Sequence, residues 1–390
     1  MSKMYSINNS IQFTPPGEEG VIMLPIHSSS LHCLNENFGQ VAINNYCAGW
    51  QLKRKPLSVL LIILILFITN ARAQDPSFSQ FWASPLNINP ALTGNINGDW
   101  RVIMNFRSQW IGPTAPYITG TISHDRKLFV ETLPEGQRFS VGGMFMYDRT
   151  MGGVLQSVYG SGNVSYNVQI AEGYNNNHYL GAGVGLIYGH KRMDWTRVVF
   201  GEQYNGRGFD VNLPTGEFSL SAMKPYLSSS AGLTYSVGGD RANFDFGVAG
   251  FHLNQPRQTF LEDDNERLAT RWVVHANYER NLNNGLVLTT NGVYQRQTTA
   301  SYFSVGGGLG YVVDEASNTS VSAGIWYWSK NAIVPYLGFS KGKMQFGFSS
   351  DVLISKLRDS PGKRSTWEVS VIFRDIKRKN SGIIYCPPWK

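Results

Sequence analysis

The sequence contains few charged residues. Asp, Glu, Lys and Arg together make up 16% of its 390 residues, well below the roughly 25% found in soluble globular proteins. The mean hydropathy is nevertheless −0.20, which argues against a bundle of membrane helices. A chain with little charge, many Tyr, Phe, Ser, Thr and Asn, and 41 glycines is typical of a membrane β-barrel, which is apolar outside and polar inside. A secreted β-sandwich or β-helix would have a similar composition and stays open as an alternative.

Cysteine is also scarce, with only Cys33, Cys47 and Cys386 in the chain. The first two precede the cleavage site expected below, and the one that remains cannot form an intramolecular disulfide. No Cys–His cluster has the spacing of zinc ligands. The net charge of +7 is modest, and the basic runs at 53–55 and 377–379 do not alternate with aromatic residues as in nucleic-acid-binding proteins. We therefore expect no metal, no cofactor and no nucleic-acid partner.

Long apolar runs are missing as well. The run at 57–68 is too short for the roughly 20 residues of a spanning helix. A basic segment precedes it and Ala71-Arg72-Ala73 follows it, which predicts a secretory signal peptide over 52–73, cleaved between Ala73 and Gln74. A signal peptide begins near its charged region, so we interpret residues 1–51 as a misassigned start or a disordered extension; an unusually long n-region is the alternative. Because Gln74 rather than cysteine follows the site, we expect no lipoprotein anchor.

The segment after the cleavage site, 74–98, predicts an N-terminal arm. Asn87, Asn89, Pro90 and Gly94 do not fit a regular helix or a central strand. Prolines 85 and 90 each remove a backbone donor and push the preceding residue toward extended geometry. The apolar residues of this irregular arm are Phe78, Phe81, Trp82, Leu86, Ile88 and Leu92. They need a surface or a cavity to lie against, so the arm either plugs a lumen or binds a secreted partner, or it closes the periplasmic mouth and packs the first strand.

From residue 99 the hydrophobic period becomes two. Val102, Met104 and Phe106 alternate with polar residues that include Asn105 and Arg107, the mark of a strand with one apolar face. The same alternation, in segments bounded by turn residues, predicts about fourteen strands. We expect them near 99–110, 115–126, 138–149, 155–169, 178–192, 229–237, 243–252, 271–281, 286–296, 302–312, 319–328, 333–340, 343–354 and 365–374.

These strands predict an antiparallel transmembrane β-barrel over 99–374, with a periplasmic tail at 375–390 and both chain ends in the periplasm. Short turns are expected on the periplasmic side and longer loops outside. The turns 238–241, 282–285, 313–318 and 340–343 and the loops 194–228 and 253–270 follow this rule, whereas 127–137 and 329–332 do not. The aromatic residues expected in interfacial girdles are Trp100, Trp110, Trp272, Tyr294, Tyr311, Trp326, Trp328 and Trp367.

Three patterns that resemble functional sites have simpler explanations. The glycine-rich segments 181–185 and 306–310 lie inside strands rather than at strand-to-helix turns, so strand bending or close packing of the arm is favoured over phosphate binding. The acidic residues Glu262, Asp263, Asp264 and Glu266 match no known calcium loop and indicate a solvated outer loop. The histidines after the cleavage site are scattered, with no local nucleophile motif, so we expect no enzyme. They are His124, His178, His190, His252 and His275.

One stretch also carries a family resemblance. Its matching features are Asp75-Pro76, Phe78-Ser79-Gln80, Pro85-Leu86, Asn89-Pro90-Ala91, Gly94, Arg107 and Gln109-Trp110. This pattern resembles the N-terminal signature of the PorP/SprF family, outer-membrane proteins of the type IX secretion and gliding apparatus of Bacteroidetes. Residues 347–357 and Cys386-Pro387 resemble the last strands and the tail of that family. The signature positions are candidates for a structural or a partner-binding role.

The resemblance implies a non-enzymatic outer-membrane component that supports secretion or surface anchoring of cargo proteins such as gliding adhesins. Its implied partners are periplasmic ring and motor components, secreted surface proteins and outer-membrane lipid. Loops 194–228 and 253–270 are candidates for contact with a surface protein, and the arm and tail for contacts on the periplasmic side. The alternative is a passive outer-membrane porin or hydrophobic-solute channel, which would need an open lumen.

Overall fold

The computed structural model describes residues 22–23, 75–112, 115–173, 176–216, 223–239, 241–259, 266–282, 284–329, 331–355 and 365–375. The predicted signal peptide at 52–73, the acidic residues 262–264, Cys386 and all but the first residue of the predicted tail lie outside these residues. Among the described residues, no helix is long and apolar enough to cross a membrane.

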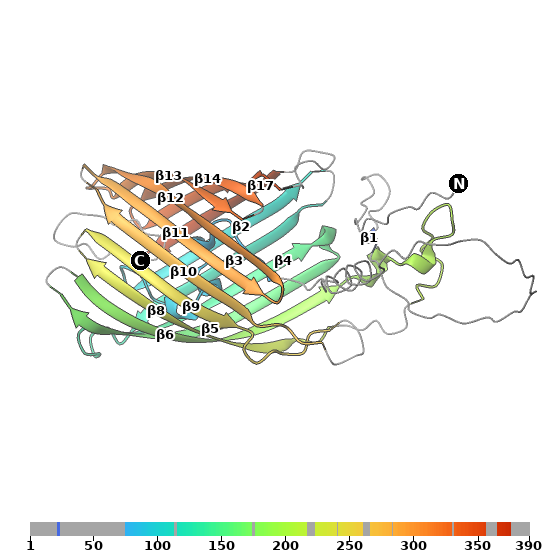
Figure 1. Cartoon of the computed structure of the whole chain (residues 1–390), viewed down its shortest axis with the longest axis horizontal. Coiled ribbons are helices and arrows are strands. Elements are labelled where there is room, and N and C mark those ends of the chain that lie inside the picture. Colours follow the sequence, from blue (N-terminus) through green and yellow to red (C-terminus); the bar gives the residue numbers. More distant parts are fainter. Residues whose placement is uncertain are drawn as a thin grey trace, which may run out of the picture. The chain divides into compact units, whose positions relative to one another are not determined.

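Within the described residues, 14 antiparallel strands close into a barrel (Figure 1). They are β2 (Trp100–Ile111), β3 (Tyr117–Leu128), β4 (Gln137–Thr150), β5 (Leu155–Glu172), β6 (Asn176–Met193), β8 (Tyr226–Gly239), β9 (Ala242–Phe251), β10 (Arg271–Asn281), β11 (Leu286–Gln297), β12 (Ala300–Asp314), β13 (Thr319–Trp328), β14 (Ala332–Lys341), β15 (Met344–Ser350), which β16 (Val352–Leu353) continues, and β17 (Ser365–Arg374). β17 pairs with β2 and β13 with β14, so the sheet leaves no open edge in lipid. The predicted strands are confirmed, with ends shifted by a few residues, and a sandwich or β-helix is excluded.

The alternation of polar and apolar residues along a strand places polar residues toward the lumen and apolar residues on the outer face. On β2, Arg101, Asn105 and Arg107 are buried in the lumen, whereas Met104 and Phe106 are 40% and 41% exposed on the outer face. The same alternation runs through the other strands because successive side chains of a strand point to opposite faces. The barrel therefore has an apolar exterior, and its lumen holds these polar residues together with inward apolar residues that cluster with the arm, among them Ile103, Trp326 and Ile372.

The two ends of the barrel differ in their connections. One end, here called the turn end, carries 129–136, 173–175, 240–241, 282–285, 315–318 and 342–343. The other, here called the loop end, carries 112–116, 151–154, 194–225, 252–270, 298–299, 329–331 and 354–364. The loop end holds η4 (Met151–Gly153), η5 (Trp195–Arg197), β7 (Val198–Val199) and η6 (Gly201–Gln203), and the two-residue β1 (Ile22–Met23) pairs in parallel with β7. Both long loops fall at one end, as predicted, and the two predicted exceptions remain exceptions.

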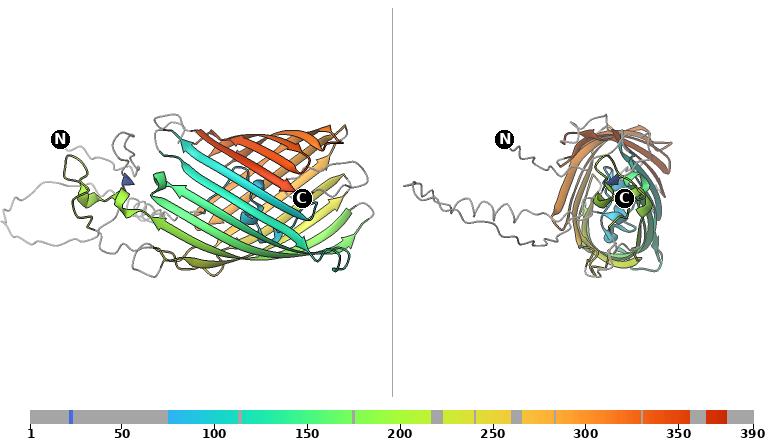
Figure 2. Two further views of the ribbon diagram at one scale, coloured as in Figure 1. Left: turned by 180° about the vertical axis from the view of Figure 1, so that it is seen from behind. Right: turned by 90° about the vertical axis from the view of Figure 1, so that its right-hand side faces the viewer.

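The arm lies inside the barrel, where the end-on view of Figure 2 shows it in blue. It forms three 3-10 turns, η1 (Phe81–Ala83), η2 (Pro85–Asn87) and η3 (Pro90–Leu92). Pro85 and Pro90 each occupy the first position of a turn, where a missing N–H costs little. The arm is therefore ordered and irregular, as predicted, and its six predicted apolar residues are all buried.

Two predicted girdle residues lie elsewhere. Trp326 and Trp328 are buried in the lumen, because they occupy the inward register of β13 and their neighbour Tyr327 faces outward. Trp326 packs on Trp82 of the arm, with ring centroids 4.2 Å apart. Trp272, Tyr294 and Tyr311 are exposed on the outer face and Trp100, Trp110 and Trp367 are partly buried.

Candidate functional site: the arm within the lumen

The first residue of the arm that the structure describes, Asp75, is held at the loop end. Its carboxylate lies 2.7 Å from His252 Nε2 and 3.4 Å from Arg271 Nε. Its backbone N–H donates to Gln297 Oε1 over 3.1 Å, and His252 Nδ1 lies 2.8 Å from Ser228 Oγ. Burial alone would raise the pKa of the Asp75 carboxyl, but His252 and Arg271 hold that pKa well below its usual range. Asp75 is therefore an ionised anchor for this end of the arm.

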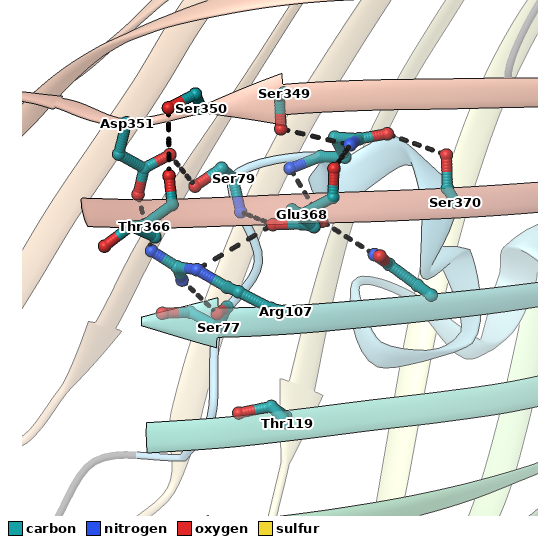
Figure 3. A network of polar contacts seen from close by, with 12 residues as sticks. Ser77, Ser79, Arg107, Thr119, Ser349, Ser350, Asp351, Thr366, Glu368 and Ser370 are labelled. Carbon is teal, nitrogen blue, oxygen red and sulfur yellow. Dashed lines mark hydrogen bonds and ion pairs between the residues drawn. The ribbon is translucent and has the colours of Figure 1, made fainter. Parts of the chain in front are cut away.

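A buried carboxylate on β17 receives the next part of the arm (Figure 3). Glu368 accepts hydrogen bonds from the backbone N–H groups of Ser79 at 2.8 Å and Gln80 at 3.1 Å. It also accepts one from the Asn105 side chain at 2.8 Å. An irregular segment cannot pair all its own backbone donors, and buried donors need partners. The wall of the barrel supplies a carboxyl acceptor for two of them.

Arg107 joins the arm to the acidic residues of the wall. Its Nη2 lies 2.8 Å from Asp351 Oδ2 and its Nε 3.8 Å from Glu368 Oε2. Its Nη1 donates to the Ser77 carbonyl over 2.6 Å, and Ser79 Oγ donates to Asp351 Oδ1 over 2.7 Å. Arg107 is 1% exposed and Glu368 0%. Removing one partner from a desolvated pair of this kind costs about 3–5 kcal/mol, so the network holds the arm firmly.

The side chain of Gln80 completes the same network. Its Nε2 donates to Ser349 Oγ and to the Glu368 carbonyl, each over 3.0 Å. Its Oε1 accepts from Ser370 Oγ over 2.7 Å. Three positions of the family signature, Ser79, Gln80 and Arg107, thus meet at one site although they belong to the arm and to β2.

Asn89 fixes the middle of the arm. Its Oδ1 accepts from the Ala91 N–H over 2.8 Å and so caps η3. Its Nδ2 donates to the Leu233 and Val248 carbonyls, at 3.1 and 3.3 Å, and lies 3.1 Å from His275 Nε2. One amide therefore ties the first turn of η3 to β8, β9 and β10.

Glycines in the wall make room for η3. A Cβ on Gly183 would lie 2.4 Å from the Ala91 nitrogen, and a Cβ on Gly232 would lie 2.0 Å from Asn89 Oδ1. The two glycines are opposite each other on β6 and β8. The expectation that glycine serves close packing of the arm is confirmed at Gly183. On β12, a Cβ on Gly306 would instead lie 2.3 Å from a carbonyl oxygen of β13.

The last part of the arm docks near the turn end. Gly94 has a φ of 65°, which favours glycine, and its N–H donates to Asp125 Oδ2 over 2.7 Å. Asp125 also accepts two hydrogen bonds from Arg101, at 3.0 and 2.8 Å. Lys127 Nζ donates to the Ile96 carbonyl over 2.6 Å. The arm thus completes a second buried ion pair of the wall with one of its own backbone donors.

The arm therefore runs through the whole lumen, from Asp75 at the loop end to Ile96 at the turn end. The last described residue, Asp375, lies at the turn end, where its N–H donates to the Trp100 carbonyl over 3.0 Å. Asp75 and Asp375, the described residues nearest the two expected chain ends, therefore lie at opposite ends of the barrel. The expectation that both chain ends lie in the periplasm stays a prediction. Polar contacts at both ends of the lumen and between them hold the arm across it.

The signature positions divide between the arm and the end of β2. Phe78, Pro85, Pro90 and Ala91 are buried with the arm residues already described. Gln109, partly buried, pairs in register with Tyr117. Trp110 has a φ of 61° and donates its N–H to Thr366 Oγ1 over 3.1 Å, where the register of β2 and β17 is irregular. Gln109 and Trp110 thus shape the loop end of β2 rather than the seat of the arm.

Five wall residues that hold the arm were missed at the sequence level. They are Asp125, His252, Arg271, Asp351 and Glu368. Ser79 and Glu368 are 289 positions apart, so no local motif joins them. An ionisable residue at an inward strand position, as at Asp125 and Glu368, is the signal that would have drawn attention to them.

One cavity beside the arm has a volume of about 50 Å³ and lies between Trp82 and β11–β14, where Asn291, Trp326 and Tyr336 line it. One water needs about 10–15 Å³, so this cavity holds a few waters. Small-molecule pockets are usually about 300–1,000 Å³, so the cavity is too small for a typical solute.

Ser228, His252 and Asp75 include the residue types of a hydrolase triad. Ser228 is 1% exposed and His252 3%, and Asp75 also pairs with Arg271. A nucleophile must reach its substrate, and this serine is covered, so the contacts serve as an anchor for the arm. Among the described residues, no group of three or more His, Cys, Asp or Glu is placed to hold a metal ion. Glu266 is the one member of the acidic cluster that these residues include.

A closed antiparallel barrel with an apolar exterior and a lumen filled by its own N-terminal arm defines an integral outer-membrane protein. Comparison with protein families narrows this class. The family model for the type IX secretion system membrane protein PorP/SprF matches residues 70–373. The chain belongs to this family, which confirms the resemblance found in the sequence. A comparison with curated proteins finds no match.

A comparison with solved structures finds similar chains at low identity. The Ralstonia pickettii toluene transporter TbuX is 11% identical, with a TM-score of 0.43 over 74% of this chain and 92% of its own. The Pseudomonas putida toluene transporter TodX is 11% identical, with a TM-score of 0.44 over 78% of this chain and 95% of its own. A Pseudomonas aeruginosa FadL homologue is 9% identical, with a TM-score of 0.40 over 78% of this chain and 100% of its own.

Proposed function

We propose that this protein is a non-enzymatic component of the type IX secretion and gliding machinery that supports secretion or surface anchoring of cargo proteins such as adhesins. The observation that carries this proposal is the family match, which spans both the arm and the barrel, residues 70–373. The filled lumen supports it, because a barrel blocked by its own arm is better suited to docking than to passage of solutes.

The loop end is the proposed contact for a secreted surface protein. Bacterial barrels place their longer loops outside the cell, and loop 194–216 exposes Tyr204 and Val211, the latter 61%. Exposed apolar residues on a loop mark candidate protein contacts. We place the contacts with periplasmic ring and motor components at the turn end and in the tail at 375–390. The outer face of the barrel contacts outer-membrane lipid.

The signature positions in the arm act, in this proposal, by seating it. Phe78, Ser79, Gln80, Asn89 and Ala91 are buried, so they are not available to a partner while the arm is in place. These residues then affect partner binding only indirectly, because the seated arm shapes the two ends of the barrel where partners would bind.

Affinity isolation of the tagged protein from outer membranes in mild detergent, followed by mass spectrometry, tests the proposal. We expect to recover a large surface protein with a C-terminal sorting domain, or periplasmic ring lipoproteins. Val211→Glu at the loop end should reduce recovery of the surface protein. Val130→Glu, in a turn-end connection and 48% exposed, is the matched control and should not. Recovery of the barrel alone, together with steady conductance in a planar bilayer, would favour a passive pore and reject the proposal.

A further inference from the structure

The first and the last contacts of the arm lie at opposite ends of the barrel. Asp75 contacts His252, just after β9, and Arg271, the first residue of β10, and both lie at the loop end. Ile96 contacts Lys127, at the turn end of β3. A segment with these contacts at its two ends crosses the lumen from one mouth to the other.

The contacts between these points include one return toward the loop end, because Arg271 Nη2 also donates to the Asn87 carbonyl over 3.1 Å and to Asn87 Oδ1 over 3.2 Å. Ser79 binds Asp351, which lies between β15 and β16 near the loop end. Asn89 then binds the carbonyls of Leu233 and Val248, in the interior of β8 and β9. Gly94 follows with Asp125 toward the turn end. From Asn87 onward, through Asn89, Gly94 and Ile96, each successive contact lies closer to the turn end.

Asp75 is held at the loop end by several specific contacts. The Asp75 side chain is 7% exposed and its charge is met by a guanidinium and an imidazole. Its backbone N–H is also bonded, to Gln297. Chain ends are usually poorly ordered unless they are tied down, and here the ties fix the first described residues of the arm in the mouth. Residues 75–77 are only partly buried, so this segment reaches solvent at the loop end.

We propose that the N-terminus of the mature chain lies at the cell surface, threaded through the lumen of its own barrel, while the chain after β17 lies in the periplasm. The assignment of the loop end to the outside rests on the outer-membrane topology of the proposed function. This assignment does not depend on which cargo protein is secreted. Residues 75–77 then form part of the outer face together with loops 194–216 and 252–259, and a secreted protein docked on these loops would meet the N-terminal segment of the barrel.

Labelling of single cysteines in intact cells tests this topology. The parent chain carries Ser in place of Cys33, Cys47 and Cys386. Pro76→Cys reports on the arm, Asn212→Cys on an exposed loop-end position, and Lys343→Cys on a turn-end position whose side chain is 60% exposed. The probe is a membrane-impermeant maleimide, applied before and after permeabilisation of the outer membrane. Heat-dependent migration on a gel verifies that each variant forms the barrel.

The expected result is that Pro76→Cys labels in intact cells as fully as Asn212→Cys, whereas Lys343→Cys labels only after permeabilisation. Loss of Pro76→Cys labelling in intact cells, with Asn212→Cys still labelled, would overturn the proposal. If Pro76→Cys prevents barrel formation, an epitope inserted between Gln74 and Asp75 replaces it, and that epitope must bind antibody on intact cells. Failure of either reporter leaves the co-purification result untouched, so the topology and the proposed function can fail separately.

Discussion

Gly183→Val should unseat the arm, because the backbone of η3 lies directly against Gly183. A Cβ there would lie 2.4 Å from the Ala91 nitrogen and 2.5 Å from both the Ala91 Cα and the Pro90 carbonyl carbon. Ordinary contacts between carbon atoms are about 3.5–4.0 Å. All three colliding atoms belong to the backbone, so no rotamer change relieves them and the arm must move by about 1 Å or more.

The cost of this movement can be worked out from the contacts of η3. Asn89 Nδ2 donates to the Leu233 and Val248 carbonyls over 3.1 and 3.3 Å, and a shift of that size takes both bonds beyond hydrogen-bond range. Each bond contributes about 1 kcal/mol net, and overpacking adds about 1–3 kcal/mol. Gly183→Val should therefore destabilise the seated arm by about 3–5 kcal/mol.

The control is Gly160→Val, which introduces the same side chain on the outward face of β5, where a Cβ would meet nothing within 4 Å. A surface substitution of this kind changes stability by about 0.5 kcal/mol or less. Two assays compare the variants: the midpoint of the heat-dependent gel shift in detergent, and conductance in a planar bilayer. We expect Gly183→Val to lower the midpoint and to produce open events that Gly160→Val does not. Equal midpoints and equally silent bilayers would refute the packing described for η3.

Three further changes probe other parts of the arm. Glu368→Ala leaves the N–H groups of Ser79 and Gln80 without their acceptor, which destabilises the seated arm by about 1–3 kcal/mol for each group, so bilayer conductance should rise. The control is Asp148→Ala, because the Asp148 carboxylate binds Thr119 on the neighbouring strand, and this variant should leave the conductance unchanged. The pKa of Asp75 is lower in the folded protein than in the unfolded chain, so the ionised carboxylate stabilises the folded protein fully above about pH 4, and this stabilisation is lost as the pH falls below that value. The gel-shift midpoints of the native protein and of Asp75→Asn should therefore converge in acid. Trp82→Ala removes the ring that packs on Trp326 and should cost about 3–5 kcal/mol in a urea titration, whereas Trp272→Ala on the outer face should cost less.

Much of the barrel could be predicted from the sequence because its signal is local. Inward and outward residues alternate along each strand, so β15 shows Met344, Phe346 and Phe348 on one face and Gln345, Gly347 and Ser349 on the other. Turn residues mark the ends of the strands, and the short turns and long loops sort the two mouths. The irregular character of the arm also followed from local chemistry, since Pro85 and Pro90 limit what the backbone can do.

The seat of the arm could not be predicted, because its contacts join residues far apart in the chain. Glu368 and Asp351 resemble ordinary polar positions of a lumen until Ser79 and Arg107 are placed beside them. The direction of the arm was also beyond reach, since no local pattern shows whether Asp75 lies near the start of β2 or at the opposite mouth. Trp326 was assigned to a girdle from its place near a strand end, whereas the register of β13 turns it inward onto Trp82.

The central claim is that the arm fills the lumen and closes the barrel. The most direct measurement is the conductance of the purified native protein in a planar bilayer, recorded beside the Gly183→Val variant. The account predicts no steady conductance from the native barrel and open events from the variant. Steady open-pore conductance from the native protein, unchanged by Gly183→Val, would contradict it.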